Sequence, residues 1–267
     1  METKKTEFKL VRIIYLIWRG SVRVMTVPFR GLREGRYKNS LRTFILKFQH
    51  SLPTEFVVNK GDTVVQIGTP RPRTMKRFLR AVGPNGKLII VEAMPDNQKR
   101  LEGVIQEESI QNVILIKGAA SNENRMGELL ISPYSGDHKI EVVDIAMDND
   151  LKPGNNYETR IPVRFLTLDT ELPALGVEKF DYLSVTVNGA EAEVLKGAND
   201  ILKACNVGTR VYAKGHALDS NGQPLHLITQ QIMRENGYKT KITKGEPSST
   251  LDKNWLWRSG DLYAWKS

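Results

Sequence analysis

Short apolar runs rich in β-branched residues alternate with segments of helical spacing from residue 56 onward, and this alternation limits the fold most strongly. Strands are expected over residues 62–67, 87–91, 112–116, 180–187, 209–213, 238–242 and 262–265. Helices are expected over residues 73–82, 95–106, 190–204 and 225–235. Continuous apolar strands separated by helices are typical of a parallel sheet covered on both faces. The sequence therefore predicts an open, doubly wound, mostly parallel α/β sheet, whose last two strands can pair antiparallel.

Residues 122–160 depart from this rhythm. The segment is polar, with two β-like runs at 128–131 and 140–145 and a Lys-Pro-Gly-Asn-Asn turn. We expect it to form an excursion that passes over either the edge of the sheet or its ligand-binding face.

The positive charge of the chain is concentrated in its first fifty residues. These hold 12 basic and 3 acidic side chains, and this excess of nine equals the net charge of +9 of the whole chain. We predict a basic helical extension over residues 1–55, followed by a charge-neutral α/β domain over residues 56–267. Because no nucleic-acid-binding motif accompanies the charge, no nucleic-acid partner is expected.

Residues 9–28 have the pattern of a basic amphipathic helix. Its basic side chains, from Lys9 to Arg23, fall within an arc of about 80° on a helical wheel. Arg12 interrupts the apolar run, which is too short to span a bilayer. The helix either lies on an anionic membrane surface or packs on the following domain with its basic face in solvent. Cys205 is the single cysteine, which is consistent with a reducing compartment, so we expect the protein in the cytoplasm. If the helix lies on a membrane surface, the protein is attached there peripherally.

Two residues stand where ligands bind in open α/β sheets, beyond the carboxyl ends of the strands. Gly68 follows the first strand, and Glu92 ends the second strand 24 residues later. An acid about 20 residues after a glycine turn can accept hydrogen bonds from both hydroxyls of an adenosine ribose. The alternative is that Glu92 is a solvated surface acid.

Several segments, in order and at matching spacing over about residues 58–242, resemble the FkbM-type methyltransferases. The most specific is DYLSVTVNGAEAEVLKGA at residues 181–198, and the others are DTVVQIG at 62–68, VGPNGKLIIVEAMPDN at 82–97, NVILIKGAAS at 112–121 and LTLD at 166–169. The resemblance implies a seven-stranded, Rossmann-like class I methyltransferase fold that binds S-adenosylmethionine. It also implies O-methyl transfer to a sugar or another small metabolite, so the expected partner is a small-molecule or glycan acceptor.

The resemblance also implies roles for individual residues. It places Gly68 in the cofactor loop together with Gln66, and it assigns the ribose contact to Glu92. It places Asp96 near the cofactor and Ala119 beside the adenine. For Arg71 there are three alternatives: it binds the methionine carboxylate of the cofactor, it binds another anionic ligand, or it is solvated.

The chain departs from the family pattern at its cofactor loop and after the strand at 180–187. Gln66, Thr186 and Asn188 stand where the family usually carries acids, and the Pro-Arg-Pro-Arg run at 70–73 replaces small residues and a second glycine. Prolines have no N–H to offer a ligand. These departures leave a second hypothesis beside the enzyme, a methyltransferase-like scaffold or binding module without activity.

Glu191 and His216 are the candidate catalytic bases for deprotonating an acceptor hydroxyl. Glu191 starts the helix at 190–204, so its alternative role is that of a capping acid. His216 follows the strand at 209–213, and its alternative is a packed or surface histidine. Asp169, a third candidate, also fits a turn. The other histidines are scattered, so no metal site is expected.

Overall fold

The computed structural model describes residues 57–68, 71–133, 138–141, 157–215, 224–244 and 260–267. All of them belong to one compact unit, Thr43–Ser267. The amphipathic helix predicted at 9–28 and the domain boundary predicted after residue 55 lie outside the described residues. Within the described ranges, no helix combines the length and the apolar character that crossing a membrane requires.

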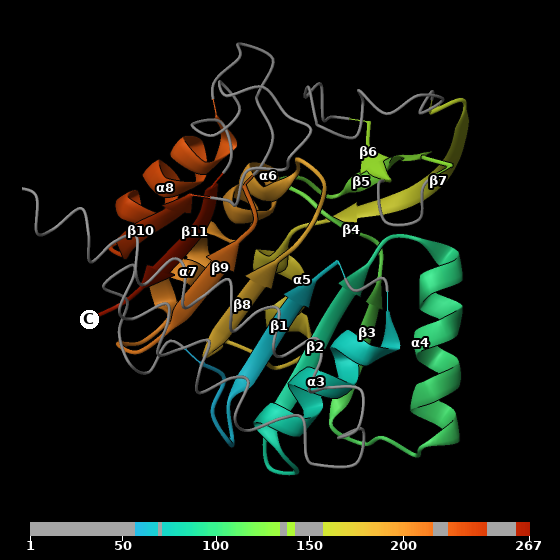
Figure 1. Ribbon diagram of the computed structural model, residues 1–267, viewed down its shortest axis with the longest axis horizontal. Helices are drawn as coiled ribbons and strands as arrows, with labels where there is room; N and C mark the ends of the chain where they lie inside the picture. Colours follow the sequence, from blue (N-terminus) through green and yellow to red (C-terminus); the bar gives the residue numbers. More distant parts are fainter. Residues whose placement is uncertain (1–56, 69–70, 134–137, 142–156, 216–223, 245–259) are drawn as a thin grey trace, which may run out of the picture. The chain divides into compact units, whose positions relative to one another are not determined.

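A seven-stranded sheet in the order β10-β11-β9-β8-β1-β2-β3 forms the centre of the fold (Figure 1). Its strands are β1 (Thr63–Ile67), β2 (Lys87–Glu92), β3 (Val113–Lys117), β8 (Tyr182–Val185), β9 (Arg210–Ala213), β10 (Lys239–Lys244) and β11 (Gly260–Trp265). β11 runs antiparallel to both of its neighbours, and the remaining pairs are parallel. The predicted fold is confirmed, including the antiparallel pairing of the last two strands. Strand order reverses between β1 and β8, which makes this point the topological switch point.

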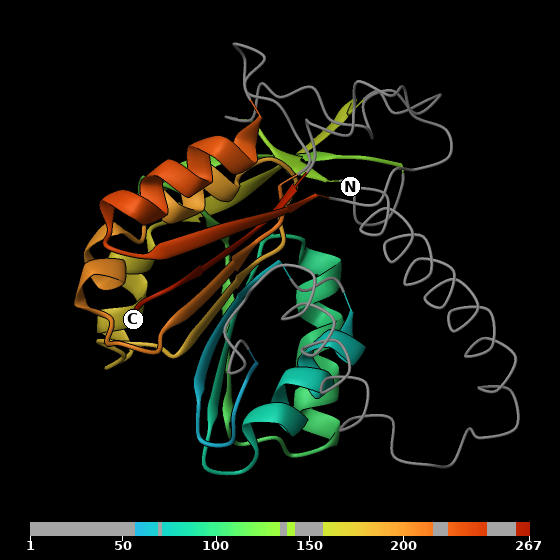
Figure 2. The same ribbon diagram turned by 60° about the vertical axis from the view of Figure 1, so that its left-hand side comes forward.

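Helices cover the two faces of the sheet (Figure 2). They are α3 (Pro72–Val82), α4 (Pro95–Glu107), α5 (Leu168–Ala174), α6 (Glu191–Lys196), α7 (Asn199–Ala204) and α8 (Leu225–Glu235). Side chains of α3 and α4 pack with Val64 on one face, whereas those of the other four pack with Val65 on the opposite face. Because successive strand residues point to opposite faces, a continuous apolar strand serves both layers.

The helix predicted at 190–204 is interrupted, and α6 and α7 are separate. A Cβ at Gly197 would lie 1.9 Å from the backbone oxygen of Ser121, so only glycine allows this close approach. The carboxylate of Asp169 accepts hydrogen bonds from the N–H groups of Asp200 and Ile201, at 3.0 and 2.9 Å. Asp169 thus satisfies the first N–H groups of α7. The structure thus gives the Asp169 carboxylate a capping role, and its candidacy as a base stays an untested prediction.

A second sheet of four strands, in the order β4-β7-β5-β6, lies above the carboxyl ends of β1 and β2 (Figure 1). Its strands are β4 (Ala119–Ala120), β5 (Arg125–Ile131), β6 (Lys139–Ile140) and β7 (Thr159–Leu166). The sequence predicted part of β5 and only the last residue of β6, Ile140, and it did not predict β7, which contains Pro162. Residues 142–145 of the predicted run lie outside the described part. The apolar face of this sheet includes Leu129 and Phe165 and packs against Met94 and Ala190.

Candidate active site

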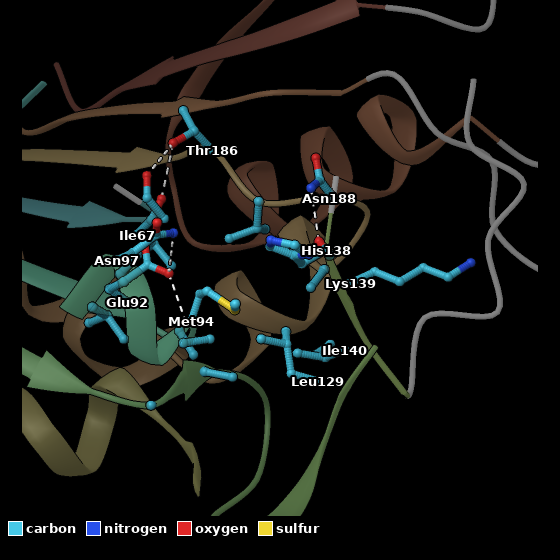
Figure 3. Close-up of a pocket in the computed structure, with 18 residues that line it drawn as sticks. Ile67, Glu92, Met94, Asn97, Leu129, His138, Lys139, Ile140, Thr186 and Asn188 are labelled. Atoms are coloured by element: carbon cyan, nitrogen blue, oxygen red, sulfur yellow. Dashed lines mark hydrogen bonds between the residues drawn. The ribbon is translucent and has the colours of Figure 1, made fainter. Parts of the chain in front are cut away.

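A pocket lies at the switch point, between the carboxyl ends of the main sheet and the second sheet (Figure 3). The described residues around it enclose about 100 Å³. The main sheet and the segments that follow its strands contribute Gly68, Glu92, Asn97 and Thr186, and the second sheet contributes Leu129 among others. The described parts of the segment 122–160 therefore lie over the face of the pocket, as the second of the two predicted alternatives has it.

Gly68 permits the tight turn that leaves β1 on the floor of the pocket. Its φ is 76°, a conformation that favours glycine. A Cβ at position 68 would lie 2.6 Å from the backbone oxygen of Thr186, so the close approach of the segment after β8 also requires glycine at this position. The Gly68 N–H donates to the backbone oxygen of Val91 at 2.9 Å and joins the turn to β2. The next two residues of the predicted cofactor loop, 69 and 70, lie outside the described residues.

Glu92 ends β2 with its carboxylate held in one orientation at the pocket. Its Oε1 accepts hydrogen bonds from the N–H of Met94 at 2.9 Å and from the amide of Asn97 at 3.3 Å. Its backbone oxygen accepts from the side chain of Gln98 at 2.8 Å. Both bonds end on Oε1 and hold the carboxylate in place at the pocket, and a carboxylate is an acceptor for ligand hydroxyls. The alternative of a solvated surface acid is excluded, because Glu92 is only 6% exposed.

Gln66 lies beneath the pocket and acts through its neighbours. Its Nε2 donates to the Gly68 backbone oxygen at 2.8 Å and to Thr186 Oγ1 at 2.9 Å. Thr186 Oγ1 in turn lies 2.9 Å from the Gly68 backbone oxygen, to which it can donate. Gln66 Oε1 is buried and has no hydrogen-bond partner among the described residues. A neutral hydrogen-bond network therefore joins the ends of β1 and β8.

The second sheet closes the pocket with apolar side chains and one histidine. Leu129 and Ile140 line it from above. His138 Nδ1 accepts the N–H of Ser132 at 3.1 Å, and the His138 backbone oxygen accepts from the Asn188 amide at 2.9 Å (Figure 3). The latter bond connects the second sheet to the segment that follows β8.

The structure brings some of the predicted site residues together and leaves others apart. Gly68, Glu92 and Ala119 all line the pocket. Arg71 is exposed just before α3 and Asp96 is exposed in the first turn of α4, and neither belongs to the described lining. Sequence reasoning missed Asn97, although its spacing of four residues to the buried Leu101 places both on the inward face of α4.

His216 lies outside the described residues, so its role as a base stays a prediction. His138 and Lys139 line the pocket, although no sequence pattern pointed to them. They reach it through the pairing of β5 with β6, which no local pattern reveals. Across the described parts of the chain, no cluster of side chains could hold a metal ion.

Glu191 is buried directly after Ala190, a lining residue of the pocket. It is only 1% exposed, and neither carboxylate oxygen has a hydrogen-bond partner among the described residues. Burial raises the pKa of Glu191 to about 8, while the nearby N–H groups of Glu191 and Gly189 and the cation of Lys214 oppose the rise. The side chain is therefore largely protonated at neutral pH, and the described pocket lining does not include it.

The order of the strands divides the pocket into three successive parts. Ala119 and Ala120 lie just beyond the end of β3, Glu92 ends β2, and Gly68 and Thr186 follow β1 and β8. Neighbouring strands are about 4.8 Å apart, so these parts lie along one line across the strand ends. An adenosyl group fits this order, with its base at the alanines, its ribose at Glu92 and its sulfur-bearing end at Gly68 and Thr186.

These features define a class of protein, the α/β proteins that bind a nucleoside at the switch point of a largely parallel sheet. The methyltransferase FkbM domain matches residues 64–240. The chain belongs to the FkbM methyltransferase family and is an S-adenosylmethionine-dependent methyltransferase. Of the two hypotheses drawn from the sequence, this match supports the enzyme. No curated protein sequence shows significant similarity to the chain.

Solved structures of methyltransferases resemble the chain at low sequence identity. Fibrillarin from Aeropyrum pernix, with S-adenosyl-L-methionine bound, is 17% identical with a TM-score of 0.48, and the match covers 86% of this chain and 76% of that one. An O-methyltransferase from Bacillus cereus in complex with SAH is 11% identical with a TM-score of 0.44, over 93% and 90% of the two chains. Precorrin-6y C5,15-methyltransferase from Geobacter metallireducens is 11% identical with a TM-score of 0.44, over 90% and 95%.

Proposed function

We propose that this enzyme transfers a methyl group to a hydroxyl oxygen of a sugar or another small metabolite. The observation that carries the proposal is the oriented carboxylate of Glu92, which faces the pocket beside the Gly68 turn. This pair holds the nucleoside end of the cofactor, and the segment after β8 leads from the pocket toward Glu191. The methyl donor supplies an electrophilic carbon on a sulfonium when it is bound.

The residues of the chain contribute chiefly by positioning. Glu92 accepts the ribose hydroxyls, and the alanines after β3 leave room for the flat base. Leu129 and Ile140 exclude water from above. Positioning two reactants in line can lower a barrier by about 7–11 kcal/mol, so this transfer needs little further chemistry from the protein.

Glu191 is our proposed base for the acceptor hydroxyl. Its pKa of about 8 leaves a useful fraction of carboxylate near neutral pH, and its two oxygens have no partner among the described residues. It adjoins the lining residue Ala190, so the acceptor would approach from this end of the pocket. His216 remains the second candidate base, because it follows β9 closely in the sequence.

The proposal is tested by methyl transfer from isotopically labelled S-adenosylmethionine to a panel of sugars and small hydroxylated metabolites. Mass spectrometry should detect a methyl ether. Replacing Glu191→Gln should lower kcat by about 10²–10⁴-fold and remove the pH dependence of kcat, while binding of S-adenosylhomocysteine is retained. Transfer to nitrogen or carbon acceptors alone would refute the assignment to hydroxyl groups.

We also propose that residues 9–28 attach the enzyme to anionic membranes. The support is the amphipathic pattern and the excess of nine positive charges in the first fifty residues. The full chain should sediment with vesicles that contain phosphatidylserine but not with pure phosphatidylcholine. The double reversal Arg12→Glu and Arg19→Glu should abolish sedimentation, while the same reversal at the exposed Lys99 and Lys203 should not. Equal loss in both variants would contradict the proposal.

A further inference from the structure

The charged side chains of α3 are all basic and share its outer face. The inner face of the helix, which includes the buried Met75, packs on the main sheet. At 100° per residue, the exposed Arg73, Arg77 and Arg80 fall within an arc of about 60° on the opposite side. We propose that these three arginines, the basic face of α3, dock on an anionic membrane and orient the α/β domain there. The inference rests on the membrane attachment proposed above.

The helix maintains its basic face at a local energetic cost. Arg73 lies in the first turn, where the partial positive charge of the helix end disfavours a cation, and this turn contains no acid. Arg77 follows Arg73 by four residues and Arg80 follows Arg77 by three, so neighbouring cations repel one another. Departures from such local rules are expected at functional surfaces. An anionic surface beside α3 would turn both unfavourable effects into attraction.

The remainder of the domain balances its charges. The net charge of the chain is accounted for by its first fifty residues, so residues 51–267 have no net charge. Each arginine of the second sheet pairs with an acid: Arg125 with Glu141, Arg160 with Glu128 and Arg164 with Glu171. On α3, Lys76 lies beside the basic face and pairs with Glu108 at the end of α4. The concentration of arginines on α3 is therefore a local feature of this domain.

A membrane fits this surface better than another polyanion does. Guanidinium groups bind phosphate oxygens with paired hydrogen bonds, and lipid headgroups present such oxygens across a plane. One exposed helix face can place its arginines on that plane together, whereas no nucleic-acid-binding motif accompanies them. Stable attachment to a membrane generally requires two weak signals, so a second contact complements the N-terminal helix proposed above.

Docking through α3 would bring the pocket close to the lipid headgroups. The helix follows β1 and begins at the end of the main sheet that carries the pocket (Figure 1). Arg71, the residue before α3, follows Gly68 by three residues, which span at most about 11 Å. The first turn of α3 and the Gly68 turn would therefore approach the membrane together.

Fluorescence quenching on vesicles tests the orientation. The single cysteine, Cys205, is buried, so a dye can be attached selectively at Thr74→Cys on α3 or at the exposed Gln231→Cys on α8, across the main sheet. The full chain is bound to phosphatidylserine vesicles that contain a nitroxide-labelled headgroup lipid. The dye at position 74 should be quenched, and the dye at position 231 should not. Quenching at 74 that is no stronger than at 231 would overturn the inference.

The affinity for the same vesicles gives an independent test. Each basic residue near an anionic leaflet strengthens binding about fivefold. We expect affinity to fall by about tenfold or more at low salt in the triple variant Arg73→Gln, Arg77→Gln and Arg80→Gln, and high salt should reduce this difference. The matched control removes three exposed cations from α7, α8 and β10, and should bind like the wild type: Lys203→Gln, Arg234→Gln and Lys239→Gln.

The outcomes separate this surface from the attachment on which it rests. Equal loss of affinity in the two triple variants would overturn the docking of α3, and so would a preference for single-stranded RNA over the vesicles that the α3 variant abolishes. A full chain that binds no phosphatidylserine vesicles would refute the membrane attachment proposed above as well. Both triple variants should bind S-adenosylhomocysteine like the wild type, so the methyltransferase function is tested separately.

Discussion

The two sheets that enclose the pocket contribute different chemistry. The seven-stranded sheet supplies polar groups held in place by hydrogen bonds, chiefly Glu92 with its donors Met94 and Asn97. The four-stranded sheet supplies mainly an apolar cover, in which Leu129 and Ile140 face the pocket. One sheet therefore determines which polar groups of a ligand are recognised, and the other determines how completely the ligand is removed from water.

This division between a polar and an apolar sheet explains why the pocket lies between the two sheets. Hydrogen bonds to a ligand gain strength when water is excluded around them. The apolar face of the second sheet packs directly above the strand ends that carry the polar groups. If the division is correct, substitutions in the main sheet should change affinity more than substitutions of similar size in the second sheet.

Removal of the Glu92 carboxylate should have the largest effect. Glu92→Ala removes the acceptor of two ribose hydroxyls, and hydrogen bonds to a charged group contribute about 1.5–3 kcal/mol each. We expect the affinity for S-adenosylhomocysteine to fall about 100-fold or more in calorimetry. Glu92→Gln, which keeps one acceptor oxygen, should lose less. The matched control is Asp96→Ala at an exposed position in the first turn of α4, which should leave the affinity unchanged.

Glu191 and Glu92 both lie on the side of the main sheet, but they differ in their hydrogen bonds. The Glu92 carboxylate accepts hydrogen bonds, whereas the Glu191 carboxyl has no partner among the described residues. Its pKa rises from 4.5 in the unfolded chain to about 8 in the folded protein, so the folded state binds more protons between these pH values. This group's contribution to the free energy of unfolding therefore falls as pH rises from 4.5 to 8. The free energy of unfolding of Glu191→Gln, measured in urea relative to that of the wild type, should therefore increase by about 2–3 kcal/mol between pH 6 and pH 8.5.

A difference between Glu191→Gln and wild type that is the same at both pH values would contradict this account. Such a result would show that the carboxyl keeps an ordinary pKa, and it would remove the support for Glu191 as a base near neutral pH.

The second sheet should show the smallest effect on affinity. Leu129→Ala removes apolar surface above the ligand, and we expect a loss of about 1 kcal/mol, or about fivefold, in affinity for S-adenosylhomocysteine. The neighbouring Leu130 is also buried but is not part of the described lining, since successive strand residues point to opposite faces. Leu130→Ala should destabilise the fold without changing affinity. If the two substitutions weaken binding equally, the second sheet does not form the cover.

The sequence predicted the main sheet well because its signals are local. Apolar runs such as β2 and β3 are recognisable one at a time, and parallel sheets place the ends of such strands at one edge. The Gly68 and Glu92 pair was found for the same reason. The second sheet was predicted only in fragments, because β7 contains Pro162 and pairs with β5 across an intervening segment. His138 and Lys139 were missed with it.

Other details depended on tertiary contacts that no local pattern contains. At the break before α7, Gly197 approaches Ser121 closely, although the two residues lie far apart in the chain. The burial of Glu191 likewise depends on packing between elements. Helical periodicity alone favoured one continuous helix, and the start of a helix favoured an exposed capping acid.

The central claim is that the Gly68 turn and the Glu92 carboxylate form a nucleoside pocket, and thermal unfolding with S-adenosylhomocysteine tests it most directly. At a ligand concentration 100 times the dissociation constant, binding should stabilise the folded chain by about 2.7 kcal/mol and raise its Tm. Glu92→Ala should lose most of this shift at the same ligand concentration. An unchanged Tm at millimolar ligand, for wild-type protein with intact folding by circular dichroism, would contradict the claim.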